Sequence, residues 1–136
     1  MENIKKQYYA QAAETLSKKL IKRNFQPIIC ESLEEAKMAA LDLIPEAATV
    51  SYGGSMTLVK SGIIESLYAR WQSIIDREKA KDLVERHELM KRALTTDYYL
   101  TSFNGISEDG QIVNIDSVGN RVAAITYDPD KGFAFV

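Results

Sequence analysis

The feature that most constrains the fold of this chain is an alternation of helical and strand-like segments along its first half. Residues 4–24 and 32–44 each repeat apolar side chains at helical spacing, with Asn24 as the expected stop of the first helix and a Ser32–Glu35 capping box at the start of the second. Residues 27–30 and 48–52 are short apolar runs of the length expected for strands. Such alternation is typical of layered folds in which helices connect parallel strands. The sequence therefore predicts an α/β fold, and the right-handed crossover rule places the second strand beside the first.

The second half of the chain continues this alternation toward a hairpin and a last strand. Residues 79–94 place apolar side chains on one face of a helix, and residues 98–116 indicate two strands joined by a tight turn. The length of 136 residues predicts a single domain over residues 1–136. The other expected elements are a helix beginning near Met56, a short helix at 63–67, a strand at 73–75, a helix around 122–125 and a strand at 133–136.

Composition excludes several classes of partner. The net charge is -2, so we expect neither nucleic acid nor an anionic membrane as a partner. The N-terminal segment is polar and does not have the pattern of a signal peptide. No apolar run approaches the ~20 residues that a membrane-spanning helix needs. We therefore expect a cytoplasmic protein.

Cysteine and histidine are too scarce for metal chemistry by this chain alone. Cys30 and His87 are the single residues of their kinds, whereas zinc and iron–sulfur sites need several such ligands. We expect no metal site and no cofactor within this chain, and the sequence leaves other cofactors unknown. Both residues fall in apolar patterns, so we interpret them as packed and inert. Trp71 is expected in the core or at an interface.

A glycine-rich turn, Gly53-Gly54-Ser55, follows the apolar run at residues 48–52. Two glycines let the backbone approach a ligand closely, and the free N–H groups of a helix start attract carboxylate or phosphate. Open α/β sheets bind ligands at such strand ends. The alternative is a tight strand-to-helix turn that binds nothing, and the residues leave both interpretations open.

A second junction, at residues 116–121, leads from the hairpin into a helix. Asp116 can cap this helix, Gly119 and Asn120 tolerate unusual backbone angles, and Arg121 offers a bidentate fork for an anion. The alternative is a helix cap with a surface salt bridge. Together with the glycine-rich turn, this junction favours a pocket for an anion or another small ligand.

The turn at residues 107–111 joins the two hairpin strands. Asp109 and Gly110 suit an ordinary hairpin turn, because Asp favours turn positions and Gly supplies a positive φ. The alternative makes Glu108 a general base or a nucleophilic carboxylate. The local pattern alone favours the plain turn.

Two stretches carry a resemblance to a known family. SYGGSMTLVKSGI at residues 51–63 and LTSFNGISEDGQIVNIDSVGNRVAAITYDP at residues 100–129 resemble the LUD-domain family, which is of the lactate-utilisation type. The resemblance covers most of the chain, including the Ile75-Asp76-Arg77 step. It implies a three-layer Rossmann-like sheet with helices on both faces, as in the NagB/RpiA/CoA-transferase-like superfamily of sugar-phosphate isomerases and CoA transferases. It also implies a bacterial protein of lactate oxidation that acts alongside iron–sulfur partner subunits.

The resemblance also bears on catalysis and on the chain's end. The related CoA transferases carry a catalytic glutamate in a Ser-Glu-Asn-Gly pattern, which Ser107-Glu108-Asp109-Gly110 resembles, so Glu108 is the implied catalytic residue. The chain departs from the family at Asp128-Pro129, where members have Gly before Pro, and at Val136, where members continue. We therefore expect a C-terminally shortened domain. Its uncovered last strand favours a homodimer or another partner.

Two functions are consistent with these patterns. The first is binding of a small anionic metabolite, a carboxylate or a phosphate, at the strand ends, with Glu108 as acid/base or nucleophile. The second is a non-catalytic subunit or interaction protein of a lactate-oxidation or redox assembly. The predicted ligand-binding residues are Gly53, Gly54, Ser55, Asn104, Asp116, Gly119, Asn120 and Arg121.

Overall fold

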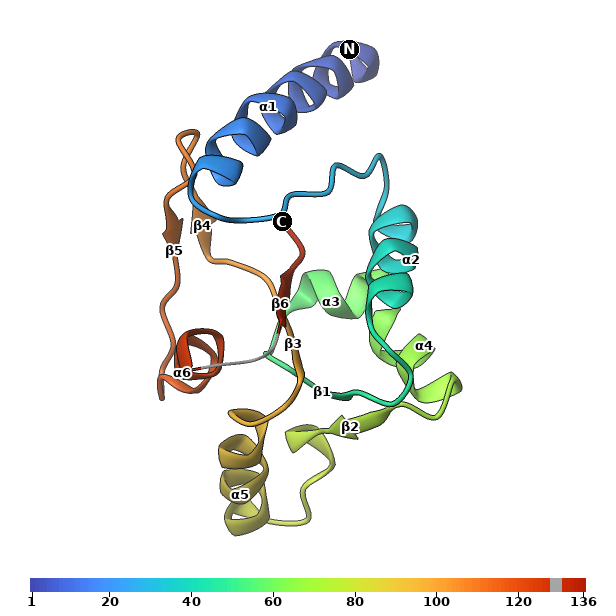
Figure 1. Ribbon diagram of the computed structural model, residues 1–136, viewed down its shortest axis with the longest axis vertical. Helices are drawn as coiled ribbons and strands as arrows, with labels where there is room; N and C mark the ends of the chain where they lie inside the picture. Colours follow the sequence, from blue (N-terminus) through green and yellow to red (C-terminus); the bar gives the residue numbers. More distant parts are fainter. Residues whose placement is uncertain (128–130) are drawn as a thin grey trace.

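A parallel four-stranded sheet forms the centre of the fold (Figure 1). The computed structural model describes residues 1–127 and 131–136, so the Asp128-Pro129 step lies outside the described residues. The α/β fold with a parallel sheet that the sequence predicts is confirmed. In spatial order the strands are β2 (Ser73–Ile75), β1 (Thr49–Tyr52), β3 (Tyr98–Thr101) and β6 (Lys131–Ala134).

Helices cover both faces of this sheet, as a three-layer Rossmann-like fold requires. The chain moves outward from β1 to β2 and then back across β1 to β3. Because right-handed crossovers in opposite directions place their helices on opposite faces, the helices divide into two groups, which lie on different sides of the sheet in Figure 1. One group is α2 (Leu33–Leu43), α3 (Met56–Ser61) and α4 (Ile63–Ala69), and the other is α5 (Leu83–Ala93) and α6 (Asn120–Tyr127).

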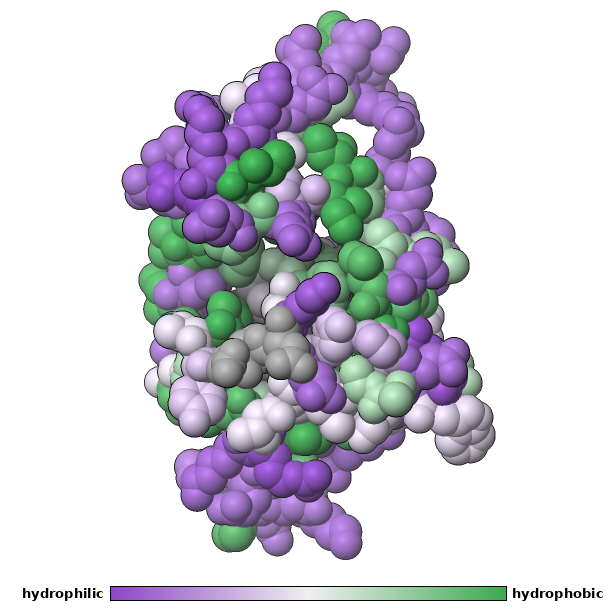
Figure 2. Space-filling view, in the orientation of Figure 1, coloured by the Kyte–Doolittle hydropathy of each residue, from purple (hydrophilic) through white to green (hydrophobic). Residues whose placement is uncertain are grey.

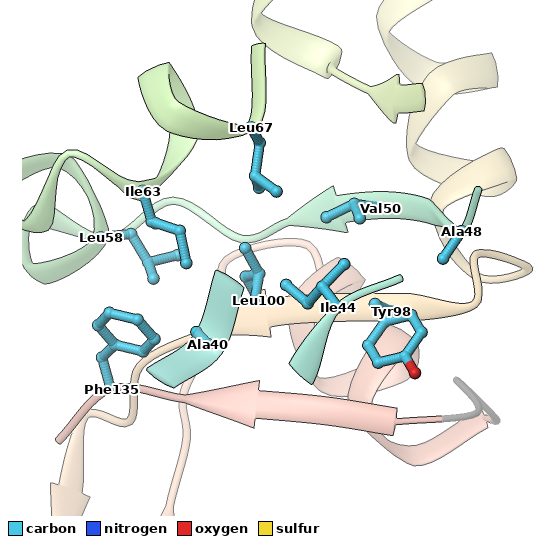
Figure 3. Packing of buried hydrophobic residues seen from close by; sticks show 10 residues of the cluster. All are labelled: Ala40, Ile44, Ala48, Val50, Leu58, Ile63, Leu67, Tyr98, Leu100 and Phe135. Atoms are coloured by element: carbon cyan, nitrogen blue, oxygen red, sulfur yellow. The ribbon is translucent and has the colours of Figure 1, made fainter. Parts of the chain in front are cut away.

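The hydrophobic core lies between the sheet and the α2–α3–α4 layer (Figure 3). Side chains alternate along each strand, so Val50 and Leu100 face this layer while Ser51 and Tyr99 face the other side. The opposite face of the sheet therefore carries polar groups that the core does not use. The buried cluster consists of Ala40, Ile44, Ala48, Val50, Leu58, Ile63, Leu67, Tyr98, Leu100 and Phe135.

Side-chain caps explain where several helices begin and end. The Ser32 hydroxyl accepts a hydrogen bond from the Glu35 N–H at 3.2 Å, and the Glu35 carboxylate accepts one from the Glu31 N–H at 2.7 Å, which confirms the predicted capping box. Asn24, at φ +66°, ends α1 (Glu2–Lys22), as predicted. Asp82 accepts from the Glu85 N–H at 2.8 Å and starts α5. The predicted helix at 79–94 was therefore too long at its start, where a 3₁₀ turn, η1 (Arg77–Lys79), precedes it.

One predicted strand was wrong, and another is divided. Residues 27–30 form no strand, and Ile28 and Ile29 are exposed because this segment does not join the sheet. The strand after α2 consequently lies between β2 and β3 instead of beside an earlier strand. The strands predicted over residues 98–116 are also divided, since β3 joins the parallel sheet. Only β4 (Gly105–Ile106) and β5 (Ile112–Val113) pair as an antiparallel hairpin.

Three single-residue interpretations also need correction. His87 is exposed on α5 and does not pack, because this helix has no buried residue. Trp71 is 94% exposed, so it lies outside the core, and the alternative place at an interface stays a prediction. Cys30 is only half-buried and lies in irregular chain. Apolar spacing alone did not distinguish the covered face of a helix from an uncovered one.

The N-terminal helix α1 extends away from the sheet (Figure 1). None of its residues is buried against the rest of the described chain. Its last turn lies beside the hairpin, where the Arg23 Nε donates to the Asp109 carbonyl oxygen at 3.1 Å. Of the helices that the structure describes, none combines the length and the apolar composition needed to cross a membrane.

Candidate functional site

The strand order creates a crevice between the carboxyl ends of β1 and β3. From the end of β1 the chain continues to β2 on one side, and from the end of β3 it continues to β6 on the other, which makes this the point where the order of the sheet reverses. The Gly53 N–H donates to the Leu100 carbonyl at 2.9 Å, and the hydroxyls of Ser55 and Ser102 lie 2.7 Å apart. These bonds hold the two loops side by side.

Both glycines of the first loop lie against an arginine side chain. A Cβ on Gly53 would lie 3.0 Å from the Arg121 Cδ and 3.1 Å from the Tyr99 hydroxyl oxygen. A Cβ on Gly54 would lie 3.0 Å from the Arg77 Nη2. The glycines therefore let two guanidinium groups approach the backbone at the crevice.

Arg121 is held by groups of the protein itself. Its side chain is buried, and its Nε lies 3.0 Å from the Asp116 Oδ1. The contact is an ion pair, not an aligned hydrogen bond, because that N–H finds no hydrogen-bond partner among the described residues. Arg121 Nη2 donates to the Asn104 Oδ1, and the other Asp116 oxygen caps α6 by accepting from the Val122 N–H at 2.7 Å. Arg121 thus joins the β3 loop to the start of α6.

Arg77 and Arg86 are held in place by one carboxylate. Glu78 Oε1 lies 3.2 Å from the Arg77 Nε and 3.1 Å from the Arg86 Nη2. The hydrogen bond from Arg86 and the positive charges of both arginines lower the pKa of Glu78. Glu78 therefore stays ionised and keeps the two guanidinium groups close together.

These groups surround a cavity of about 530 Å³. Its wall combines guanidinium groups and amides with three apolar side chains. Arginine forks and backbone N–H groups of this kind bind carboxylate and phosphate oxygens. The lining residues are Gly54, Arg77, Arg86, Met90, Asn104, Ile115, Asp116, Ser117, Val118, Asn120 and Arg121.

The structure brings most of the predicted site residues together. Gly54, Asn104, Asp116, Asn120 and Arg121 line the cavity. The remaining glycines and Ser55 shape the loops next to it without lining it. Gly53 contacts Arg121, Ser55 caps α3 by accepting from the Leu58 N–H at 3.3 Å, and Gly119 adopts φ +72° directly before α6.

Glu108 lies elsewhere. It is exposed in the turn between β4 and β5, and it is not among the residues that line the cavity. At this turn Arg23 Nη2 lies 3.6 Å from the Asp109 Oδ2, and the Ser107 hydroxyl bonds to Asp109. The turn thus contacts the end of α1. The catalytic role of Glu108 stays a prediction.

Sequence reasoning missed the two arginines that Glu78 holds. Arg77 comes shortly after β2, as Gly53 comes after β1. Because the carboxyl ends of parallel strands lie at one edge of the sheet, this position was a signal that could have identified Arg77. Arg86 lies within α5. The charged residues around it in the sequence have the pattern of an ordinary solvent-exposed helix face, so nothing in the sequence singles it out. The apolar rim residues Ile115 and Val118 gave no local signal either.

Half-buried tyrosines support the loop that carries Arg77. Asp76 accepts hydrogen bonds from the hydroxyls of Tyr52 at 2.9 Å and Tyr68 at 2.6 Å, and from the Glu78 N–H. Burial, reinforced by Asp76, raises the pKa of both tyrosines. Burial also raises the pKa of Tyr99 to about 12, although the positive charge of Arg77 opposes this. All three hydroxyls are therefore protonated at neutral pH.

Metal ligands do not gather at this site. Across residues 1–127 and 131–136, no group of three or more His, Cys, Asp or Glu side chains is placed to hold a metal ion. The polar side chains that line the cavity are arginines, amides, the Asp116 carboxylate and the Ser117 hydroxyl.

The parallel sheet, with an arginine-lined cavity where the strand order reverses, identifies the protein as an α/β protein with a Rossmann-like fold. The chain belongs to the LUD-domain family, because the family model described as "LUD domain" matches residues 13–136. The family is of the lactate-utilisation type. Comparison with curated proteins and with solved structures gave no match.

Proposed function

We propose that the protein binds a small anionic metabolite, a carboxylate or a phosphate, in the cavity at the strand ends. One observation carries the proposal: Arg77, Arg86 and Arg121, from three different elements, line the same cavity. Among the residues that the structure describes, two carboxylates contact these arginines, Asp116 and Glu78. The excess positive charge favours an anion.

The three arginines have different roles in this proposal. Arg121 is a positioning residue, because Asp116 and Asn104 already engage it. Arg77 and Arg86 bind the anion, and Gly54 and Asn120 add polar groups next to them. The lactate-utilisation type of the family supports small carboxylates as candidates. For this role we propose a cytoplasmic location in a bacterium.

Titration calorimetry and thermal shift with inorganic phosphate, lactate and pyruvate test this function. A bound anion raises the melting temperature, and at 100 times Kd it stabilises the fold by about 2.7 kcal/mol. Arg77→Gln is expected to weaken binding at least tenfold, since it removes a charge-assisted pair. Arg92→Gln is the control with the same change of charge, since Arg92 is exposed on α5 outside the cavity lining. If none of the anions binds, the proposal fails.

A catalytic role for Glu108 is a separate proposal that rests on the resemblance of its turn to the CoA-transferase pattern. Its exposed position means that it would act on a ligand reaching beyond the cavity or bound at the hairpin. Glu108→Gln in a turnover assay with a substrate identified by binding tests this role. Unchanged turnover would exclude it.

A second candidate function is that of an interaction protein or subunit in a redox assembly. We propose it because Ile4 and Tyr8 lie on one face of α1 at helical spacing, are 69% and 60% exposed, and follow Met1, which is 98% exposed. A homodimer or iron–sulfur partner subunits would cover this face. Light scattering of the pure protein, and co-purification with such subunits, test it. A monomer that retains no partner would contradict it.

A further inference from the structure

We infer that the ligand is a phosphate monoester with an apolar or aromatic body, larger than a three-carbon acid such as lactate. This inference rests on the proposed function, because it specifies the ligand class of the same cavity. It comes from three properties of the lining: its two-sided chemistry, its volume and the number of its donors.

The lining has a charged side and an apolar side. Arg77, Arg86 and Arg121 supply the charged side. Ile115 and Val118 belong to the lining and remain 77% and 71% exposed. A ligand that covers these exposed apolar side chains removes apolar surface from water. This stabilises the complex by roughly 25 cal/mol per Å² of apolar surface buried. An anion without an apolar body leaves that gain unused.

The cavity volume agrees with this chemistry. About 530 Å³ lies within the range of roughly 300–1,000 Å³ that is usual for ligands larger than a simple acid. Arginines and apolar side chains share this lining. In this proposal a three-carbon acid engages the arginines alone, and a phenyl-sized body joined to the anionic head also covers Ile115 and Val118.

The number of donors favours phosphate as the anionic head. Glu78 occupies one edge of the Arg77 guanidinium and part of Arg86, so each still has N–H groups to offer. The Arg77 Nη2 also lies beside the Gly54 backbone. A phosphate monoester presents three acceptor oxygens and nearly two negative charges, which suits two arginine forks better than a single carboxylate does.

Calorimetry with two phosphate esters tests the inference. Methyl phosphate and phenyl phosphate are both dianions at about pH 8, since their second pKa lies near 6. Phenyl phosphate is expected to bind about tenfold more tightly. Val118→Ser and Ile115→Ser are each expected to reduce this ratio, by lowering the affinity for phenyl phosphate more than the affinity for methyl phosphate. Val113→Ser is the matched control, because Val113 is exposed on β5 outside the cavity lining.

The outcomes separate this inference from the proposed function. Equal affinities for the two esters would overturn the inference, as would lactate binding without any ester binding, and both results leave the anion site intact. Failure of every anion, lactate and pyruvate included, overturns both. If Val113→Ser lowers the ratio as much as Val118→Ser, the apolar contact is not at this cavity and the inference is wrong. Circular dichroism checks that each variant is folded.

Discussion

At the scale of single residues, Gly53 is a position where the site leaves no room for a larger residue. Its Cα faces the hydroxyl of the buried Tyr99 and the side chain of Arg121, which Asp116 holds. We predict that Gly53→Ala lowers the free energy of unfolding by about 1–3 kcal/mol, because the added methyl overpacks this contact. Binding of phosphate should weaken as well, since Arg121 must move. Urea denaturation and calorimetry measure the two effects.

Gly105→Ala is the control for this prediction. No heavy atom lies within 4 Å of a Cβ at Gly105, and its φ is not positive. The variant is expected to change the free energy of unfolding by less than about 0.5 kcal/mol. If Gly53→Ala is equally mild, Arg121 is not fixed by its contacts and its positioning role is wrong.

At the scale of elements, the end of α4 carries an unfavourable residue. The Trp71 N–H bonds to the Tyr68 carbonyl and the Gln72 N–H to the Leu67 carbonyl, a Schellman motif in which Trp71 takes φ +61°. A residue with a Cβ is strained there. We predict that Trp71→Gly raises the free energy of unfolding by about 0.5–1 kcal/mol, measured by urea denaturation.

Trp71→Ala separates the two parts of that prediction. It removes the indole but keeps the Cβ, so we expect little gain in stability from it. If Trp71→Gly instead destabilises the protein, then the indole, exposed as it is, makes a contact in solution such as a self-association interface.

Three tyrosines, on β1, α4 and β3, predict a loss of stability at high pH. Burial raises the pKa of Tyr99 to about 12, and it also raises those of Tyr52 and Tyr68. In the unfolded chain tyrosine titrates near about pH 10, so above that pH the folded state binds more protons than the unfolded state. The contribution of these groups is complete below about pH 10 and is lost as the pH rises toward 12.

Urea denaturation between about pH 9 and pH 11.5 checks this, together with the ultraviolet absorbance of tyrosinate. Tyr99→Phe should make the decline with pH shallower, because one linked group is removed. Titration of every tyrosine near about pH 10 in the folded protein would contradict the prediction.

The sequence predicted elements well where local chemistry decides them. The Ser32 capping box, the Asn24 stop and the Gly53-Gly54 turn are set by neighbouring residues, and each forms as expected. Prediction from the sequence failed where pairing with distant strands decides whether a segment becomes a strand. Apolar residues 27–30 have the propensity of a strand but stay outside the sheet, because the edge positions belong to β2 and β6.

At the scale of the whole molecule, the cavity exists because the strand order brings distant loops to one edge of the sheet. Residues following β1, β2 and β3 are far apart in the sequence, and only the topology makes them neighbours. The sequence could therefore identify Gly54 and Arg121, which lie in conspicuous turns, but not Arg86, which approaches from a helix face. Figure 2 shows hydrophobic side chains lying among hydrophilic ones across one face of the molecule.

The projecting helix α1 gives a test that separates the two proposed functions. Residues 1–12 are all exposed, and the ion pair between Lys6 and Glu31, at 3.6 Å, is exposed too and so contributes little. We predict that deleting residues 1–12 changes the free energy of unfolding by less than about 1 kcal/mol and leaves phosphate affinity unchanged. If α1 carries the partner contact, the same deletion converts an oligomer seen by light scattering into a monomer. A large loss of stability in a protein that was already monomeric would show that α1 packs on its own chain.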